Sequence, residues 1–85
     1  MNVIFAPTAF EDYCYWQQTD RTTLRRINRL IDDILRDDPY RGIGKPEQLR
    51  YIDAWSRRID EVHRLVYRIV DGDLFILQAR YHYSD

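Results

Sequence analysis

The stretch HRLVYRIVDGDLFILQARYHY, residues 63–83, decides the fold, because two runs of alternating side chains flank the turn residues Asp71 and Gly72. Apolar and polar residues alternate along each run, which is typical of half-buried strands. An Asp-Gly pair between two such runs indicates a tight β-hairpin. We therefore predict two antiparallel strands, at 62–69 and 73–83.

The length of the hairpin loop determines which side chains face the core. A three-residue loop, 70–72, pairs Ile69 with Asp73 and keeps Arg80 away from the core. A two-residue loop pairs Val70 with Asp73 and turns Arg80 inward, where an unpaired guanidinium is costly. We therefore predict the three-residue loop. In that register the core face carries Leu65, Tyr67, Ile69, Phe75, Leu77 and Ala79, and the opposite face carries Arg64, Arg68, Leu74, Ile76, Gln78, Arg80 and His82.

Two helices are predicted before the hairpin. Thr8 and Glu11 have the spacing of a capping box, which places the start of a first helix at Thr8. This helix should end near Thr19. Asp20 is a good N-cap for a second helix with apolar residues at helical spacing, and Pro39 ends it.

The remaining chain reads as short strands joined by turns. We predict strands at 2–6, 49–52, 55–60, 62–69 and 73–83, with a glycine-containing loop at 40–49. The order β-α-α-β-β-β-β, with short connections at the end, predicts a mostly antiparallel sheet. The two helices should cover one face of it. The fold class is therefore α+β.

Length and composition indicate one small domain, residues 1–85, with 45% hydrophobic and 32% charged residues. The beginning of the chain lacks the charged segment and apolar run of a signal peptide, and no stretch approaches the ~20 apolar residues that span a bilayer. Cys14 is the one cysteine and has no metal-ligand spacing around it. We expect a soluble, cytoplasmic protein without a metal or cofactor.

Charge is unevenly distributed, although the net charge is only −1. Residues 41–68 carry seven Lys and Arg against four acidic residues. A locally basic segment in a nearly neutral protein suits a confined anion site better than a broad nucleic-acid-binding face. A sheet with a solvated charged face would explain the same distribution equally well.

The predicted polar face suggests a chemistry. Arginines beside the imidazole of His82 could bind a phosphodiester and protonate a leaving oxygen. RNA supplies its own nucleophile, the 2′-hydroxyl, so such a site needs only a base, an acid and cationic support. Glu47 offers a carboxylate base. A single histidine on a sheet is more often structural, so the residues alone leave the function open.

Four segments resemble the YoeB-type toxins of the RelE/ParE toxin–antitoxin superfamily. They are DYCYWQQTD at 12–20, GKPEQL at 44–49, WSRRIDEVHRLVYRI at 55–69 and ARYHY at 79–83. The resemblance implies the RelE/YoeB-like microbial RNase fold, with two helices on an antiparallel sheet. It further implies a ribosome-dependent endoribonuclease that cuts mRNA in the ribosomal A site, is neutralised by a YefM-type antitoxin, and forms a homodimer.

The resemblance also assigns roles to residues. It implies that Glu47 is the general base on the 2′-hydroxyl, that Arg64 neutralises the scissile phosphate, and that His82 is the general acid for the 5′-oxygen. Tyr83 would orient the substrate or the imidazole. The supporting RNA-binding residues would be Lys45, Arg57, Arg58 and Arg80. His63, which the register places on the apolar face, is interpreted as structural.

Two other functions remain open from the sequence. A ParE-like toxin would have the same fold but act on a protein target such as gyrase, without a nuclease site. A binding module or catalytically impaired homologue is the other alternative. The ParE-like alternative is less favoured because Glu47, Arg64 and His82 are all present. The segment at 50–54 is about two residues shorter than the family pattern, and Ser84 and Asp85 follow its usual terminal tyrosine.

Overall fold

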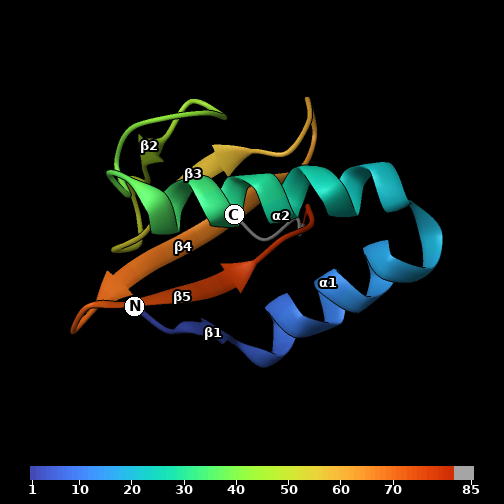
Figure 1. Cartoon of the computed structure of the whole chain (residues 1–85), viewed down its shortest axis with the longest axis horizontal. Helices are drawn as coiled ribbons and strands as arrows, with labels where there is room; N and C mark the ends of the chain where they lie inside the picture. The colour runs from blue at the N-terminus through green and yellow to red at the C-terminus, as the bar shows by residue number, and fades with distance from the viewer. Residues whose placement is uncertain (82–85) are drawn as a thin grey trace.

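The computed structural model describes residues 1–81, which form two helices and a five-stranded mixed sheet (Figure 1). The elements are β1 (Val3–Phe5), α1 (Pro7–Thr19), α2 (Arg21–Arg36), β2 (Glu47–Gln48), β3 (Trp55–Arg58), β4 (Arg64–Val70) and β5 (Asp73–Gln78). The strands lie in the order β1-β5-β4-β3-β2. β1 is parallel to β5, and the other neighbours are antiparallel. The α+β class and the predicted order of elements are confirmed.

The helix boundaries depend on local chemistry. Asp20 caps α2 as predicted, because its carboxylate accepts two backbone N–H groups of the first turn at 3.1 Å. The capping box predicted at Thr8 is wrong. α1 begins one residue earlier, at Pro7, and its N-cap Ala6 makes no side-chain cap. Proline suits this first helical position because its missing N–H would be unpaired there in any case. α2 ends at Arg36.

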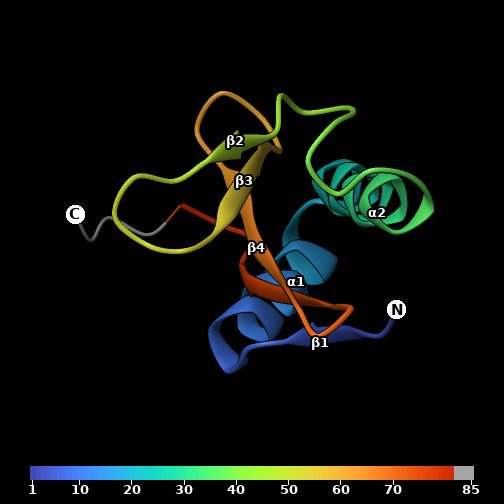
Figure 2. The ribbon, with the colours of Figure 1, turned by 90° about the vertical axis from the view of Figure 1, so that its left-hand side faces the viewer.

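Both helices contribute to one hydrophobic core on one face of the sheet. Its buried members are Ala9, Trp16, Ile27, Leu30, Ile34, Ile59, Leu65, Tyr67, Leu74, Ile76 and Ala79. The helices meet at Asp20 and diverge from there (Figure 1). The sheet twists strongly, so that β1 and β5 run in a direction different from that of β3 (Figure 2). Within residues 1–81, no helix covers the opposite face of β2, β3 and β4, which we call the open face (Figure 2).

The predicted three-residue hairpin loop is wrong. The loop has two residues, Asp71 and Gly72, and Val70 pairs directly with Asp73. Both loop residues have positive φ, 50° and 80°, which matches the twist of the flanking strands. One consequence is that the near half of β5 faces the other way from the prediction. Leu74 and Ile76 are therefore buried in the core.

A β-bulge then restores the predicted facing at the far end of the hairpin. Tyr67 pairs with Ile76, but the next residue of β4, Val66, pairs with Gln78, so Leu77 is an extra residue in β5. The shift returns Ala79 to the core and leaves Arg80 only half-buried. The bulge thus keeps the Arg80 guanidinium out of the core, which was our reason for predicting the longer loop.

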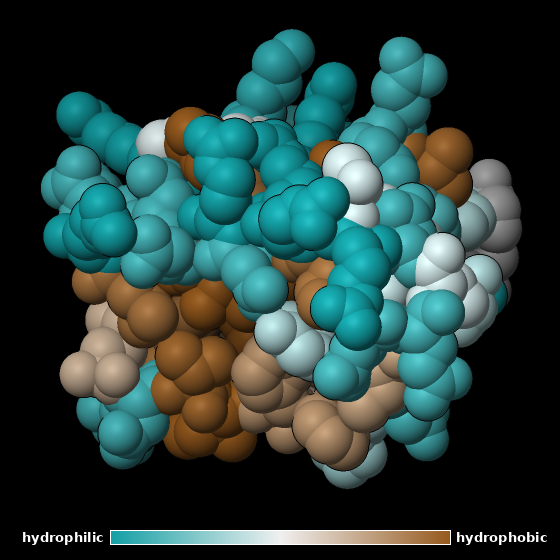
Figure 3. Space-filling model, turned by 45° about the vertical axis from the view of Figure 1, so that its right-hand side comes forward, coloured by the Kyte–Doolittle hydropathy of each residue, from teal (hydrophilic) through white to brown (hydrophobic). Residues whose placement is uncertain are grey.

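Other strand limits differ from the prediction as well. β2 lies at Glu47–Gln48 rather than at 49–52, and β5 ends at Gln78. Neither helix among the described residues has the length and apolar character needed to cross a membrane. The outward side of α2 forms a hydrophilic band, and apolar side chains reach the surface below that band (Figure 3).

Candidate active site

The open face of the sheet brings Glu47 and Arg64 into contact. Arg64 Nη1 donates a hydrogen bond to Glu47 Oε1 over 3.0 Å. Three neighbouring strands make this possible, because Glu47 lies opposite Ser56 on β3, and β3 pairs with β4, which begins at Arg64. The Glu47 side chain is 58% exposed and that of Arg64 37%. A carboxylate and a guanidinium therefore meet where solvent and a ligand can reach both.

Ser56 supports this pair from below. It is fully buried, and its hydroxyl accepts a second hydrogen bond from Arg64 Nη1 over 3.0 Å. The guanidinium is thereby held in place by two oxygens, of which only the Glu47 carboxylate is charged. Sequence reasoning missed Ser56. The sequence did hold a signal for it: residues two apart on a strand face the same side, so Ser56 faces the same side as Arg58.

More positive charge lies on the same face. Arg58 stands directly opposite Arg64 in the register of β3 and β4 and is exposed. Arg68 lies four residues after Arg64 on β4, so alternation places it on the same face. Its Nε is buried without a hydrogen-bond partner among residues 1–81. Lys45 is exposed two residues before Glu47. The carboxylate of Glu47 is thus set among cations, which suits an anionic ligand.

Arg57 does not belong to this surface. Alternation along β3 turns its side chain toward the core, where it is completely buried. Its Nε donates to the Tyr67 hydroxyl over 3.1 Å, and Nη1 donates to the Asp33 carboxylate. Nη1 and Nη2 also bind the backbone carbonyl oxygens of Ile43, Asp38, Pro39 and Arg41. The prediction that Arg57 contacts RNA does not fit this burial.

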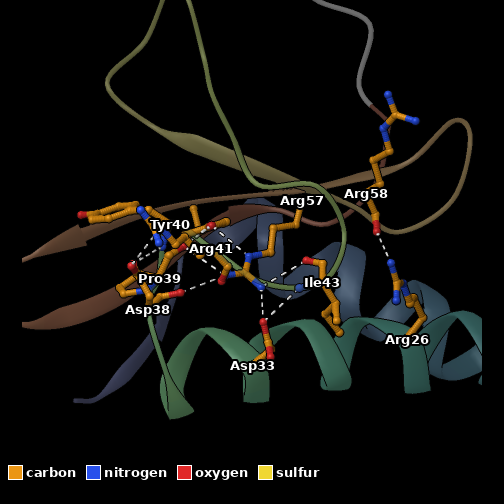
Figure 4. Close-up of polar contacts among 10 residues, drawn as sticks. Arg26, Asp33, Asp38, Pro39, Tyr40, Arg41, Ile43, Arg57 and Arg58 are labelled. Atoms are coloured by element: carbon orange, nitrogen blue, oxygen red, sulfur yellow. Dashed lines mark hydrogen bonds and ion pairs between the residues drawn. The ribbon is translucent and has the colours of Figure 1, made fainter.

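The guanidinium of Arg57 instead organises the loop that precedes β2. Figure 4 shows this group enclosed between Asp33 of α2 and the loop at 38–43. Gly42 has a φ of 126°, and a Cβ there would collide with the Asp33 carboxylate. The loop leads to Lys45 and Glu47, so Arg57 acts on the open face only by fixing the chain that arrives there.

The buried arginine also alters two neighbouring pKa values. The hydrogen bond from Arg57 holds the pKa of Asp33 below its ordinary value of 3.8, against the opposing effect of burial. Burial raises the pKa of Tyr67 above its ordinary value of 10.0, and the hydrogen bond from Arg57 opposes that rise. Asp33 is therefore ionised and Tyr67 neutral at pH 7, as this hydrogen-bond network requires.

The C-terminal residues predicted for the site are only partly described. His82 and Tyr83 lie outside the described residues. The guanidinium carbon of Arg80 lies 3.6 Å from the centroid of the Tyr15 ring on α1, so this cation contacts a helix rather than Arg64. His63 accepts a hydrogen bond at Nδ1 from the backbone N–H of Tyr81 over 2.8 Å, in keeping with a structural role.

The open face as described is suited to anion chemistry. Residues 1–81 contain no cluster of three or more His, Cys, Asp or Glu side chains that could hold a metal ion. What they do contain is a solvent-accessible carboxylate hydrogen-bonded to a guanidinium, with further arginines beside it. Such a group can accept a proton from a hydroxyl while the cations stabilise a phosphate.

Comparisons with known proteins agree with this architecture. The family model described as "YoeB-like toxin of bacterial type II toxin-antitoxin system" matches residues 5–83. A protein named Toxin YoeB from Streptomyces coelicolor is 53% identical, over 98% of this chain and all of the relative.

Solved structures of YoeB proteins are also similar to this chain. One is a YoeB–YefM complex from Staphylococcus aureus, with a TM-score of 0.90, 44% identity and 98% coverage of both chains. Another is a YoeB dimer from the same organism, with a TM-score of 0.90, 45% identity and 98% coverage of both chains.

Proposed function

Because this chain belongs to the YoeB-like toxins of bacterial type II toxin–antitoxin systems, we propose that it is a metal-independent endoribonuclease that cleaves mRNA in the ribosomal A site and so inhibits translation. The observation that carries the proposal is the contact between Glu47 and Arg64 on the open face of the sheet. A base and a cation placed together there are what attack by a 2′-hydroxyl on the adjacent phosphate needs.

Glu47 is the general base of the proposed reaction. Its carboxylate takes the proton of the 2′-hydroxyl, and the 2′-oxygen attacks the phosphorus. Arg64 stabilises the negative charge that grows on the non-bridging oxygens, and His82 donates a proton to the departing 5′-oxygen. The products are a 2′,3′-cyclic phosphate, which can open to a 3′-phosphate, and a 5′-hydroxyl. Tyr83 orients the substrate or the imidazole.

Before substrate binds, Arg64 is held in a way that allows a phosphate to replace the Glu47 carboxylate as its partner. A partly exposed ion pair is worth only about 0–1 kcal/mol, so a phosphate can replace the carboxylate at little cost. Ser56 keeps its hydrogen bond to Nη1 and so holds the guanidinium near the open face. Arg58, Arg80 and Lys45 complete the proposed RNA contacts.

We further propose that the protein binds a YefM-type antitoxin and forms a homodimer in the cytoplasm. The support is the high similarity to the Staphylococcus aureus proteins whose structures are a YoeB–YefM complex and a YoeB dimer. Apolar side chains exposed below α2 (Figure 3) add to this support, since a bound partner would cover them.

A translation extract provides the test. Purified protein is added to a defined mRNA with and without ribosomes, and the cut positions are mapped by primer extension. We expect cuts in register with codons only when ribosomes are present, and their loss in His82→Ala. An intact mRNA together with inhibited DNA supercoiling by gyrase would replace this proposal with the ParE-like alternative.

A further inference from the structure

The backbone just beyond β5 is held by side chains rather than by a neighbouring strand. β5 ends at Gln78, and the next residue, Ala79, is bonded on both sides by α1. Its N–H donates to Asp12 Oδ2 over 2.9 Å, and its carbonyl oxygen accepts from Trp16 Nε1 over 2.8 Å. In Figure 1, β5 runs toward α1, which is why one turn of the helix can reach this peptide.

A third contact fixes the chain two residues further on. The N–H of Tyr81 donates to Nδ1 of His63, and the His63 ring lies edge-on to Trp16 with centroids 4.8 Å apart. Between these two points, the guanidinium of Arg80 covers the Tyr15 ring. Side chains from α1 and from the segment before β4 therefore bind residues 79–81 at consecutive positions.

The two hydrogen bonds to Ala79 are buried, which makes them sensitive to substitution. Asp12 is 3% exposed, Trp16 is 7% exposed, and Ala79 is fully buried. A buried carboxylate is expensive unless its hydrogen bonds are made, and one bond that Asp12 accepts comes from the Ala79 N–H. A purely structural reason for this contact would be the docking of α1 on the sheet. The hydrophobic contacts of Ala9 and Trp16 already provide that docking.

We propose that Asp12, Trp16 and His63 are positioning residues that fix the backbone at 79–81 and thereby set where the chain continues to His82. The inference rests on the proposed function, in which His82 donates the proton to the leaving oxygen. A displacement of about 1 Å in a reacting group can cost about 100-fold in rate. The three hydrogen bonds hold backbone groups of Ala79 and Tyr81, and they give α1 and His63 a positioning role in the proposed reaction.

The sharpest test is a pair of variants at His63. His63→Asn keeps an acceptor oxygen near the place of Nδ1, whereas His63→Leu removes the acceptor and keeps an apolar side chain. We expect single-turnover cleavage of mRNA on programmed ribosomes to fall about 10- to 100-fold in His63→Leu and to stay within about threefold of wild type in His63→Asn. Binding to ribosomes should be unchanged in both. The His63 backbone bonds to Ile59 and Asp60 remain in either variant.

Trp16→Phe is an independent second variant, because it removes the indole N–H and retains an aromatic ring in the core. Amide hydrogen exchange, measured by NMR, should show faster exchange at Ala79 or Tyr81 in Trp16→Phe and His63→Leu, with the rest of the sheet still protected. The inference is overturned if both variants cleave within twofold of wild type, or if His63→Asn loses as much activity as His63→Leu. Failure of the wild-type protein to cleave would instead overturn the proposed function, and exchange at these amides would still report whether the segment is fixed.

Discussion

Two arginines in adjacent strands of this sheet show opposite behaviour. Arg57 on β3 is completely buried and uses all three guanidinium nitrogens in hydrogen bonds to Tyr67, Asp33 and backbone carbonyls. Arg64 on β4 is partly exposed and binds Glu47 and Ser56 through one nitrogen. Family resemblance implied RNA chemistry for both. Burial separates them, and it assigns Arg57 to stability and leaves Arg64 able to bind a substrate.

The largest effect on stability is expected from Arg57→Met. The substitution leaves Asp33 without its cation and several partly buried carbonyl oxygens without donors, which costs about 3–5 kcal/mol of unfolding free energy. For a domain of this size each kcal/mol lowers Tm by about 4–8 °C. Thermal unfolding followed by circular dichroism measures the effect.

Arg58→Met is the matched control for that comparison. It changes the next residue on the same strand, but the side chain is exposed, so the free energy of unfolding should change by no more than about 0.5 kcal/mol. Equal losses in the two variants would contradict the distinction between a buried and an exposed arginine in β3.

A smaller effect, on rate, should follow from Ser56→Ala. The hydroxyl is the neutral partner that holds Arg64 Nη1, and its loss leaves the guanidinium less well oriented toward the phosphate. Loss of one hydrogen bond to a charged group is worth about 1.5–3 kcal/mol, so cleavage should slow by roughly tenfold or more. Unchanged cleavage by a folded Ser56→Ala protein would show that Arg64 needs no such support.

The smallest effect concerns pH and the Asp33–Arg57 pair. Because the pKa of Asp33 is lowered in the folded protein, its contribution to stability is present above the unfolded value of 3.8 and is lost as the pH falls through the folded pKa. Asp33→Asn should therefore be less stable than wild type at pH 7, and the difference should narrow below about pH 4. Urea denaturation at both pH values measures it; a difference that does not narrow would argue against the linkage.

Sequence reasoning succeeded where a residue acts through its own chemistry. Asp20 was predicted as an N-cap because a carboxylate at the start of a helix can accept hydrogen bonds from its free N–H groups. The order of helices and strands was predicted from the periodicity of the apolar residues. The hairpin register was not predicted, because the bulge at Leu77 is a property of two strands together. Either loop length satisfied the local pattern, and only the bulge reconciles a two-residue turn with a half-buried Arg80.

The assignment of Arg57 to RNA binding does not fit the structure for a similar reason. Arg57 is in phase with Trp55 and Ile59, two apolar residues of the core face, and this alternation was visible in the sequence. The family resemblance implied the same role for both arginines of WSRR, so the prediction did not use this alternation. The partners that make burial tolerable, Asp33 and the carbonyl groups of the 38–43 loop, are distant in sequence and could not be recognised before the fold was known.

The central claim is that Glu47 and Arg64 form the reactive pair on the open face. Its most direct test is the single-turnover rate of mRNA cleavage on programmed ribosomes for Glu47→Gln and Arg64→Ala, with Tm measured on the same preparations. We predict a loss of about 100-fold or more in each variant, with Tm within about 4 °C of wild type, since an exposed pair contributes little stability. Cleavage by either folded variant within threefold of wild type would contradict the account.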